Sequence, residues 1–171
     1  MNDIDRIELD VFDVAYNIIG GGEEGDKHQV ETKEQADHSL PYMVAAALLD
    51  GEIGPTQYTP ERIARPDVQA LLQRVRVHPD DGFSRSFPLE MPTRIRIILS
   101  DGRTLLREKR DYEGFYTRPM SWNSVVTKFE RLAEPYTNAG LRKKIVGAVA
   151  NLETVPIREL TELLARVGRR N

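Results

Sequence analysis

The alternation of hydrophobic and polar positions is clearest between residues 94 and 110. There the sequence reads RIRIILS, then Asp101–Gly102, then RTLLREKR, which predicts two strands joined by a tight turn of the Asp-Gly kind. One face of the first strand is apolar and the other is polar, with Ile95, Ile97 and Leu99 opposed to Arg94, Arg96 and Ser100. We expect a sheet with one solvent-exposed face and a layer of helices on the other face.

The first half of the chain predicts a strand, a loop and a buried helix. Residues 4–14 mix periods of two and three, which favours a strand that runs into a helical turn through Ile19. Residues 20–31 contain three consecutive glycines and a block of charge, as expected of a mobile surface loop. Residues 40–49 are almost wholly apolar and rich in alanine and leucine, which predicts a helix capped by Ser39 or Asp37.

Prolines mark further helix starts. Pro60 and Pro66 each open a short predicted helix, and residues 74–78 are expected to turn into a strand. The carboxy-terminal third is predicted to be helical, from the cap at Ser121 to a last helix opened by Pro156. Its three apolar faces exceed what a few strands can cover, which suggests a second domain or subunit.

The predicted fold is therefore α+β, as a single domain over residues 1–171. We expect a two-layer sandwich with a mainly antiparallel sheet, the hairpin at about residues 94–110, covering helices, and C-terminal helices over residues 121–168. A length of 171 residues with 40% hydrophobic residues suffices for one ordinary domain.

Composition removes several classes of function. The formal net charge of -3 provides no positive field for nucleic acid, and the lack of cysteine excludes disulfides, thiolate metal sites and iron–sulfur clusters. No apolar run approaches the roughly 18 residues of a membrane span, and the amino terminus is acidic where a signal peptide is basic. We expect a cytoplasmic protein without nucleic-acid or membrane partners.

Candidate chemistry gathers where the apolar helix begins. The three histidines, His28, His38 and His78, lack metal-ligand spacing, so no metal site is expected. His38 lies at a helix amino terminus, where free N–H groups attract a carboxylate and should lower the pKa of the imidazole. Alternatively, His38 merely hydrogen-bonds Asp37 or a neighbouring loop.

Ser39 and Tyr42 complete this group, and each also has a purely structural reading. Ser39 is a helix cap first and a substrate ligand second, because no nucleophile elbow surrounds it. The Tyr42 hydroxyl could act as an acid or orient a carboxylate, although a packed ring with a wet tip is the commoner fate.

The run TKEQADHSLPYMVAAALLDG, residues 32–51, resembles the signature stretch of the MmgE/PrpD family of 2-methylcitrate dehydratase and cis-aconitate decarboxylase-like enzymes. Weaker similarities follow in order at residues 65–77, 95–105 and 113–133, so the resemblance covers nearly the whole chain. This sequence departs from the family pattern at residues 113–119. Many relatives have a loop there that is similar to P-x-G-x-x-x-x-P, and the first proline of that pattern is missing here.

The resemblance implies a fold and an activity. Members combine a large helical domain with a smaller α+β lid domain, and this chain resembles the smaller domain plus the final helices. The implied chemistry is proton transfer beside a carboxylate of a small tricarboxylic acid, with loss of water or carbon dioxide, or epimerisation. No metal or other cofactor is required. By the same resemblance, Tyr42 and His38 are the catalytic candidates and Ser39 the substrate-binding one.

Two hypotheses follow. The first is a part of a propionate-metabolism lyase that supplies one wall of an active site and is inactive until a helical domain or chain joins it. The second is a non-catalytic binding or assembly module that pairs with a helical partner or forms a homodimer. The particular acid and reaction, and hence whether the isolated chain is an enzyme, stay open at this point.

Overall fold

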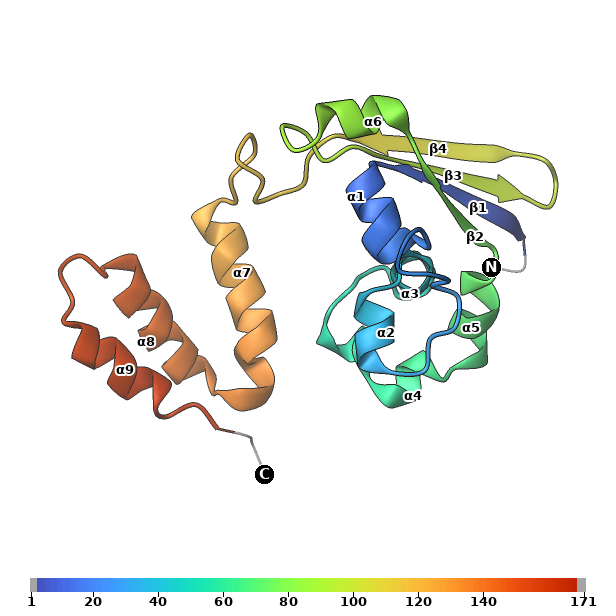
Figure 1. The fold of residues 1–171 in the computed structure, drawn as a ribbon. Helices are drawn as coiled ribbons and strands as arrows, with labels where there is room; N and C mark the ends of the chain where they lie inside the picture. The colour runs from blue at the N-terminus through green and yellow to red at the C-terminus, as the bar shows by residue number, and fades with distance from the viewer. Residues whose placement is uncertain (1–2, 169–171) are drawn as a thin grey trace. The chain divides into compact units, whose positions relative to one another are not determined.

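The computed structural model describes residues 3–168, and Figure 1 shows their fold. The chain forms two compact units, which we call unit 1 (through Tyr112) and unit 2 (from Glu113). Each has its own cluster of buried apolar residues, and each is described by itself.

Unit 1 is built on a four-stranded mixed sheet with the order β2-β1-β3-β4. The central strand β1 (Ile4–Val11) runs parallel to β2 (Val75–Pro79) and antiparallel to β3 (Thr93–Leu99). The edge strand β4 (Thr104–Lys109) pairs antiparallel with β3, and Gly102 between them adopts a positive φ of 87°. The predicted hairpin with its Asp-Gly turn is confirmed.

Helices cover one face of this sheet (Figure 1). After β1 comes α1 (Asp13–Ala15), which continues as a π-helical turn, Tyr16–Gly20. The others in this layer are short apart from α3: α2 (Lys33–Asp37), α3 (Leu40–Asp50), the 3-10 turn Pro55–Tyr58, α4 (Pro60–Ile63) and α5 (Pro66–Leu72). The helix α6 (Asp81–Ser86) lies apart from them, and the ring of its Phe83 meets Arg94 of the polar face.

The core of unit 1 lies between sheet and helices. Ile7, Leu72 and Val75 are fully buried there, and α3 runs through the layer as the longest helix of the unit. Alternate residues of β1 and β3 face this layer, as their period of two predicts. Burial of such side chains contributes roughly 1.5–3 kcal/mol each, so this layer is the main source of the unit's stability.

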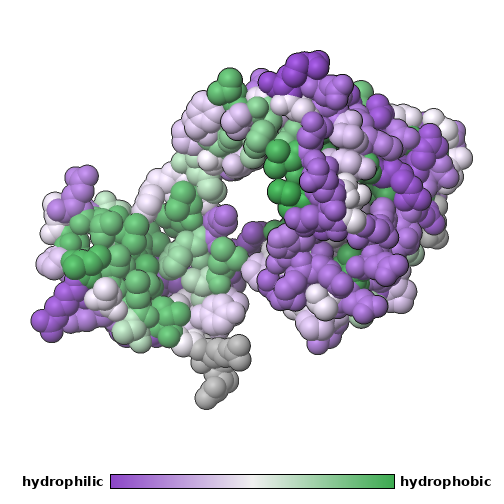
Figure 2. Space-filling model, in the orientation of Figure 1, coloured by the Kyte–Doolittle hydropathy of each residue, from purple (hydrophilic) through white to green (hydrophobic). Residues whose placement is uncertain are grey.

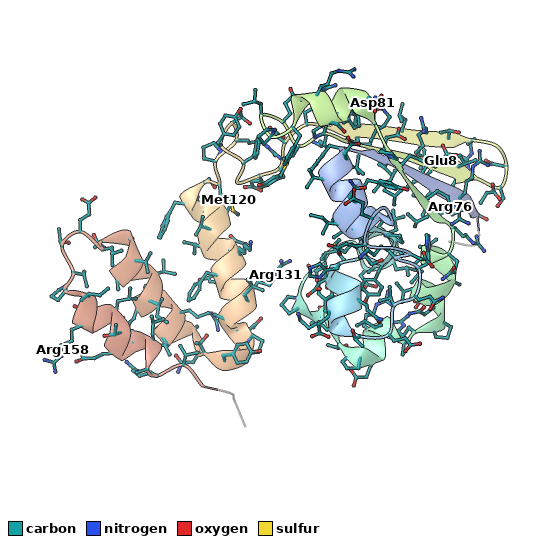
Figure 3. All side chains as sticks on the ribbon, viewed as in Figure 1. Glu8, Arg76, Asp81, Met120, Arg131 and Arg158 are labelled. Atoms are coloured by element: carbon teal, nitrogen blue, oxygen red, sulfur yellow. The ribbon has the colours of Figure 1, made fainter. Side chains whose placement is uncertain are left out.

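The opposite face of the sheet carries ion pairs. Arg96 contacts Glu8 at 3.0 Å and Asp10 at 3.3 Å, and Arg94 contacts Glu108 at 2.9 Å. Glu8 is also the register partner of Arg76 on the neighbouring strand; both are labelled in Figure 3. The predicted polar face of β3 is therefore confirmed, and it is covered by charge rather than by a second layer of helices.

Unit 2 consists of three helices and a small core. They are α7 (Trp122–Ala133), α8 (Ala139–Ala150) and α9 (Ile157–Leu164), with a 3-10 turn, Glu134–Tyr136, between the first two. Among residues 113–168, four form the buried cluster of this unit, namely Leu141, Ile145, Ala148 and Leu163. Apolar side chains gather on the surface of these helices in Figure 2, whereas the visible face of unit 1 is mostly hydrophilic.

The predicted α+β class, with its mainly antiparallel sheet and helical last third, is confirmed. The parallel pairing of β1 with β2 was not predicted, because it joins strands about 70 residues apart with five α-helices between them. Sequence reasoning also missed α2 and α6. Among residues 3–168, no helix is long and apolar enough to cross a membrane.

Candidate functional site

The beginning of α3 is held by Ser39, the predicted cap. The Ser39 hydroxyl oxygen accepts a hydrogen bond from the backbone N–H of Tyr42 at 3.1 Å and donates one to the carbonyl of Lys27 at 2.6 Å. Ser39 is fully buried. It therefore caps the helix and also ties it to the glycine-rich loop that precedes α2.

Tyr42 lies one turn into α3 and is fully buried. Its hydroxyl donates to the backbone carbonyl of Gln57, and its ring lies against Tyr58 with the ring centroids 6.1 Å apart. Burial raises the pKa of the Tyr42 hydroxyl, so the group stays protonated as a donor. In this arrangement Tyr42 joins α3 to the 3-10 turn, and its contact with a substrate stays a prediction.

His38 differs from its two neighbours because it is exposed. It terminates α2, and its Nδ1 lies 2.6 Å from the Asp37 carboxylate and 3.1 Å from the Glu34 carbonyl. The side chain is 61% exposed. Since both acceptors lie at Nδ1, Nε2 is directed away from them, and no hydrogen bond among residues 3–168 engages it. His38 can therefore offer Nε2 to a ligand.

The charge of His38 corrects one expectation. The helix amino terminus was expected to lower the pKa of the imidazole, but the Asp37 carboxylate raises it, assisted by the Glu34 carbonyl. The physical reason is position: His38 Nδ1 donates to a carbonyl at the carboxyl end of α2 and to a carboxylate, and both acceptors stabilise the imidazolium. The protonated form of the His38 ring is thus favoured.

A pocket of about 330 Å³ opens beside His38. It lies between the glycine-rich loop and α2, and its lining consists of Glu24, Asp26, Lys27, Gln29, Val30, Glu34, Gln35 and His38. Lys27 is paired with Glu24 at 3.3 Å, so carboxylates predominate in the lining. Of the three predicted site residues, His38 reaches this pocket, whereas Ser39 and Tyr42 lie in the packed interior behind it.

Comparison with known proteins identifies the family. The family model of the MmgE/PrpD C-terminal domain matches residues 1–154. This chain belongs to the MmgE/PrpD family. Cis-aconitate decarboxylase of Mus musculus is 28% identical over 151 residues, which are 88% of this chain and 29% of that protein. The enzyme of the same name from Homo sapiens is 29% identical over 123 residues, 71% of this chain and 25% of that protein.

This MmgE/PrpD chain therefore spans less than a third of the length of the curated relatives it matches. The matched region includes all of unit 1 and most of unit 2. The helix α9 begins at Ile157, beyond the end of the matched region. The family assignment thus rests on the sheet, on α3 with its capped beginning and on the first helices of unit 2.

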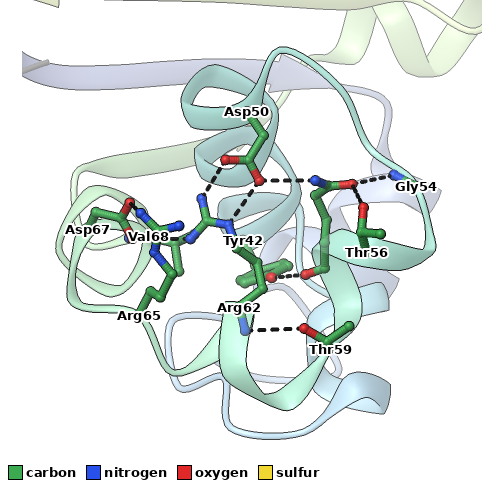
Figure 4. Close-up of polar contacts among 10 residues, drawn as sticks. Tyr42, Asp50, Gly54, Thr56, Thr59, Arg62, Arg65, Asp67 and Val68 are labelled. Atoms are coloured by element: carbon green, nitrogen blue, oxygen red, sulfur yellow. Dashed lines mark hydrogen bonds and ion pairs between the residues drawn. The ribbon is translucent and has the colours of Figure 1, made fainter.

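In this family member, the residues that position the site include a polar network missed by sequence reasoning (Figure 4). The Arg62 guanidinium donates from Nε and NH2 to the two oxygens of Asp50, at 2.8 and 2.9 Å. Gln57, whose carbonyl accepts from Tyr42, donates from its side chain to Asp50 at 3.1 Å. The network thus fixes the Tyr42 hydroxyl through Gln57. Arg62 and Asp50 are 12 positions apart and Tyr42 and Gln57 are 15 apart, so no local sequence pattern indicates these pairings.

No metal site emerges in the described part of the chain. Among residues 3–168, no group of three or more His, Asp or Glu side chains is arranged to hold a metal ion. Asp26 and His28, which lie close together, are engaged with each other at 2.6 Å.

Proposed function

We propose that this chain forms one wall of the active site of a lyase that acts on a small tricarboxylic acid, either as a dehydratase or as a decarboxylase. The support is the family match and the activity that the relatives' name states, decarboxylation of cis-aconitate. Within this proposal, residues 3–168 act as the smaller α+β domain with its final helices. The isolated chain is inactive, because the large helical part is supplied elsewhere.

The observation that carries the proposal is the setting of His38. Its Nε2 has no partner among residues 3–168, it lies at a pocket, and Asp37 holds the ring from the other side. A carboxylate that orients one ring nitrogen while the other nitrogen faces a ligand is a common arrangement for proton transfer. His38 would exchange a proton with a substrate carbon or leaving group next to a carboxylate.

Ser39 and Tyr42 have supporting roles in this proposal. Ser39 holds the loop carbonyl of Lys27 and the first turn of α3 in register with His38. Tyr42 would touch a substrate only if its hydroxyl left the Gln57 carbonyl. We propose that Ser39 lines the substrate site from behind and that Tyr42 reaches the substrate after such a rearrangement.

The negative charge of the pocket lining supports the proposal that this chain supplies only one wall of the site. Glu24, Asp26 and Glu34 face it, and Lys27 is already paired with Glu24. A tricarboxylate placed there would meet repulsion at close range, which costs several kcal/mol for unscreened like charges. The other wall must therefore bring cationic groups, and we propose that a helical partner domain or chain of the same family supplies them.

The surface of unit 2 supports such a partner. Trp122, Ile157 and Leu164 are 46%, 66% and 48% exposed. Exposed apolar patches of this kind mark interaction surfaces. A homodimer, a cytoplasmic location and a role in propionate metabolism belong to the same proposal and rest on the resemblance to the family.

The test is complementation. This chain is combined with the mouse cis-aconitate decarboxylase from which the matched segment has been removed, and turnover of cis-aconitate and of 2-methylcitrate is measured. We expect activity only with both parts present. His38→Gln should lower kcat by about 10²- to 10⁴-fold, the usual contribution of a positioned acid or base. The matched control His78→Gln, at an exposed end of β2, should leave kcat unchanged.

Two outcomes would contradict the proposal. One is a complex of both parts that binds but turns over neither acid. The other is an active complex in which His38→Gln has no effect on kcat. In the second case the family assignment stands and the proton-transfer group lies elsewhere.

The exposed apolar side chains favour a second candidate, a non-catalytic assembly module that associates through unit 2. Light scattering of the isolated chain over a range of concentrations separates it from the first. A stable dimer without affinity for either acid supports the assembly module. A monomer at every concentration argues against self-association.

A further inference from the structure

The glycine-rich loop that lines the pocket is held to the rest of unit 1 by side chains. Residues 21–31 form no helix or strand. Three carbonyls of the loop accept side-chain hydrogen bonds: Lys27 from Ser39 at 2.6 Å, His28 from Gln73 at 2.9 Å, and Val30 from Gln69 at 2.9 Å. A loop without a backbone ladder depends on such contacts for its position.

His28 makes a fourth connection, and its ring is the unusual part. Nδ1 lies 2.6 Å from the Asp26 carboxylate, and Nε2 lies 2.9 Å from the carbonyl of Val75, the first residue of β2. Both neighbours can only accept hydrogen bonds. A neutral imidazole carries one N–H, whereas the imidazolium carries two. Both bonds can therefore exist together only when the ring is charged.

We propose that His28 is a proton-operated latch, which fastens the pocket loop to β2 when the ring is charged and releases one of its two contacts when the ring is neutral. In the charged state Asp26, His28 and Val75 form a continuous chain from the loop to the sheet. In the neutral state one nitrogen faces an acceptor without a hydrogen between them, and that pair of atoms repels.

The charged groups around His28 determine how the latch responds. On the loop, Asp26 attracts the charged ring, and that hydrogen bond holds the pKa of the Asp26 carboxyl below its usual range. On β2, the Arg76 guanidinium donates to the same Val75 carbonyl at 2.9 Å and opposes the charge. Lys27 is paired with Glu24, and Gln73, which follows α5, is uncharged.

The latch acts on the pocket because the loop supplies part of the pocket wall. Glu24, Asp26 and Lys27 are on the loop, and His38 lies across from them on α2. Release of the His28 contact removes one of the four side-chain connections that hold the wall carrying Asp26, and so loosens it. The importance of this motion for a substrate rests on the proposed function. The latch itself is a property of the isolated chain and is tested without substrate, so the two proposals fail independently.

The experiment follows His28 in the full chain by NMR. Long-range proton–nitrogen spectra identify the protonation of each ring nitrogen between about pH 5 and 8, the range in which histidines change charge. Amide hydrogen exchange of residues 24–31 is measured over the same range and corrected for the intrinsic pH dependence. We expect a doubly protonated ring at low pH, and a loss of protection of about tenfold as the ring becomes neutral.

A matched pair of variants isolates the latch. His28→Gln should give a loop whose corrected exchange is fast and independent of pH, whereas His78→Gln should behave like the unaltered chain. A His28 ring that is neutral throughout overturns the proposal. So does a loop whose protection does not follow the titration of His28, and the unaltered chain alone can show either result. Retained pH dependence in His28→Gln would also overturn it.

Discussion

Unit 1 encloses fourteen residues in its main hydrophobic cluster, whereas the cluster of unit 2 contains four. The larger cluster of unit 1 forms between one face of its sheet and the helices that pack on that face. In unit 2 the helices α7 and α9 are strongly amphipathic, and no residue of α7 is buried. An amphipathic helix usually has its apolar face covered, so unit 1 encloses its own core, whereas the apolar faces of unit 2 are what the proposed helical partner would cover.

Polar groups show the same contrast. In unit 1 the Arg62 side chain is 9% exposed and meets both oxygens of Asp50. In unit 2 the ion pair of Arg158 with Glu162 lies at 2.8 Å with exposed fractions of 87% and 63%, and Figure 3 shows Arg158 extended from α9. Enclosed pairs constrain a fold, whereas pairs in water contribute little. The candidate site lies in unit 1, where the enclosed ion pair constrains the packing around it.

The largest expected effect is that of a leucine-to-alanine substitution in the core of unit 1, compared with the same substitution in unit 2. Leu72→Ala removes a fully buried side chain of unit 1 and should lower the free energy of unfolding by about 2–5 kcal/mol. Leu152→Ala, at a residue of unit 2 that is 47% exposed, should cost less than about 1 kcal/mol. Urea unfolding measures both. Trp122, the single tryptophan, reports unit 2 by fluorescence, and amide signals of β1 report unit 1.

Equal costs in the two units would break the comparison, because they would mean that unit 2 is as tightly packed alone as unit 1. If an added helical partner raises the cost of Leu152→Ala, the comparison is sharpened. The surface of unit 2 would then be a core that is completed by association.

The next effect concerns the enclosed ion pair. Arg62→Met removes the cation that faces Asp50 and leaves that carboxylate with the hydrogen bond from Gln57, so it should destabilise unit 1 by about 3 kcal/mol. Arg62→Lys keeps the charge but not the two parallel bonds, and it should recover part of the loss. Arg158→Met in unit 2 is the matched control and should change stability by less than about 0.5 kcal/mol. Thermal unfolding at a fixed salt concentration measures all three variants.

This effect should depend on pH in a definite direction. The hydrogen bond from Arg62 holds the pKa of Asp50 below its usual range. A carboxyl group with a lowered pKa contributes stability that is present above its unfolded pKa and is lost as the pH falls through the folded pKa. The difference between the unaltered chain and Arg62→Met should therefore shrink in acid. A difference that stays constant would assign the loss to packing.

The sequence predicted those parts of unit 1 that rest on local chemistry. The hairpin follows from Asp101–Gly102 between alternating residues, and α3 follows from an apolar run with Ser39 before it and Gly51 after it. For α2 a signal was present, because Thr32 and Gln35 have the spacing of a capping box. For α6 the signal was weak: Asp80 caps a segment of poor helix formers.

The site was less predictable because its geometry depends on distant partners. The sequence correctly placed His38, Ser39 and Tyr42 at the beginning of α3, but their adjacency did not show that only His38 would be exposed. The Tyr42 hydroxyl meets a carbonyl 15 positions away, and His28 meets one 47 positions away. Helix electrostatics suggested the wrong direction for the pKa of His38, since a carboxylate at 2.6 Å outweighs a helix end.

The smallest effect on stability, and the last test of the comparison, is at the surface of unit 1. Asp37→Asn removes the carboxylate that raises the pKa of His38, so that pKa should fall. The contribution of the pair is present below the unfolded pKa of His38 and is lost as the pH rises through the folded pKa. Because both side chains are solvated, the melting temperature should hardly change. NMR titration of the His38 ring measures the shift.

A second variant distinguishes a specific pair from a general change of surface charge. Lys33 contacts the other oxygen of Asp37 at 3.0 Å, and Lys33→Met removes a cation from the same cluster. It should move the pKa of His38 upward, opposite to Asp37→Asn, because the carboxylate then serves the imidazole alone. If both variants moved the titration in the same direction, or if Asp37→Asn left it in place, Asp37 would not be the group that sets the charge of His38. Opposite shifts would show that the charge of the exposed His38 is set by two neighbours on one short helix, Asp37 and Lys33.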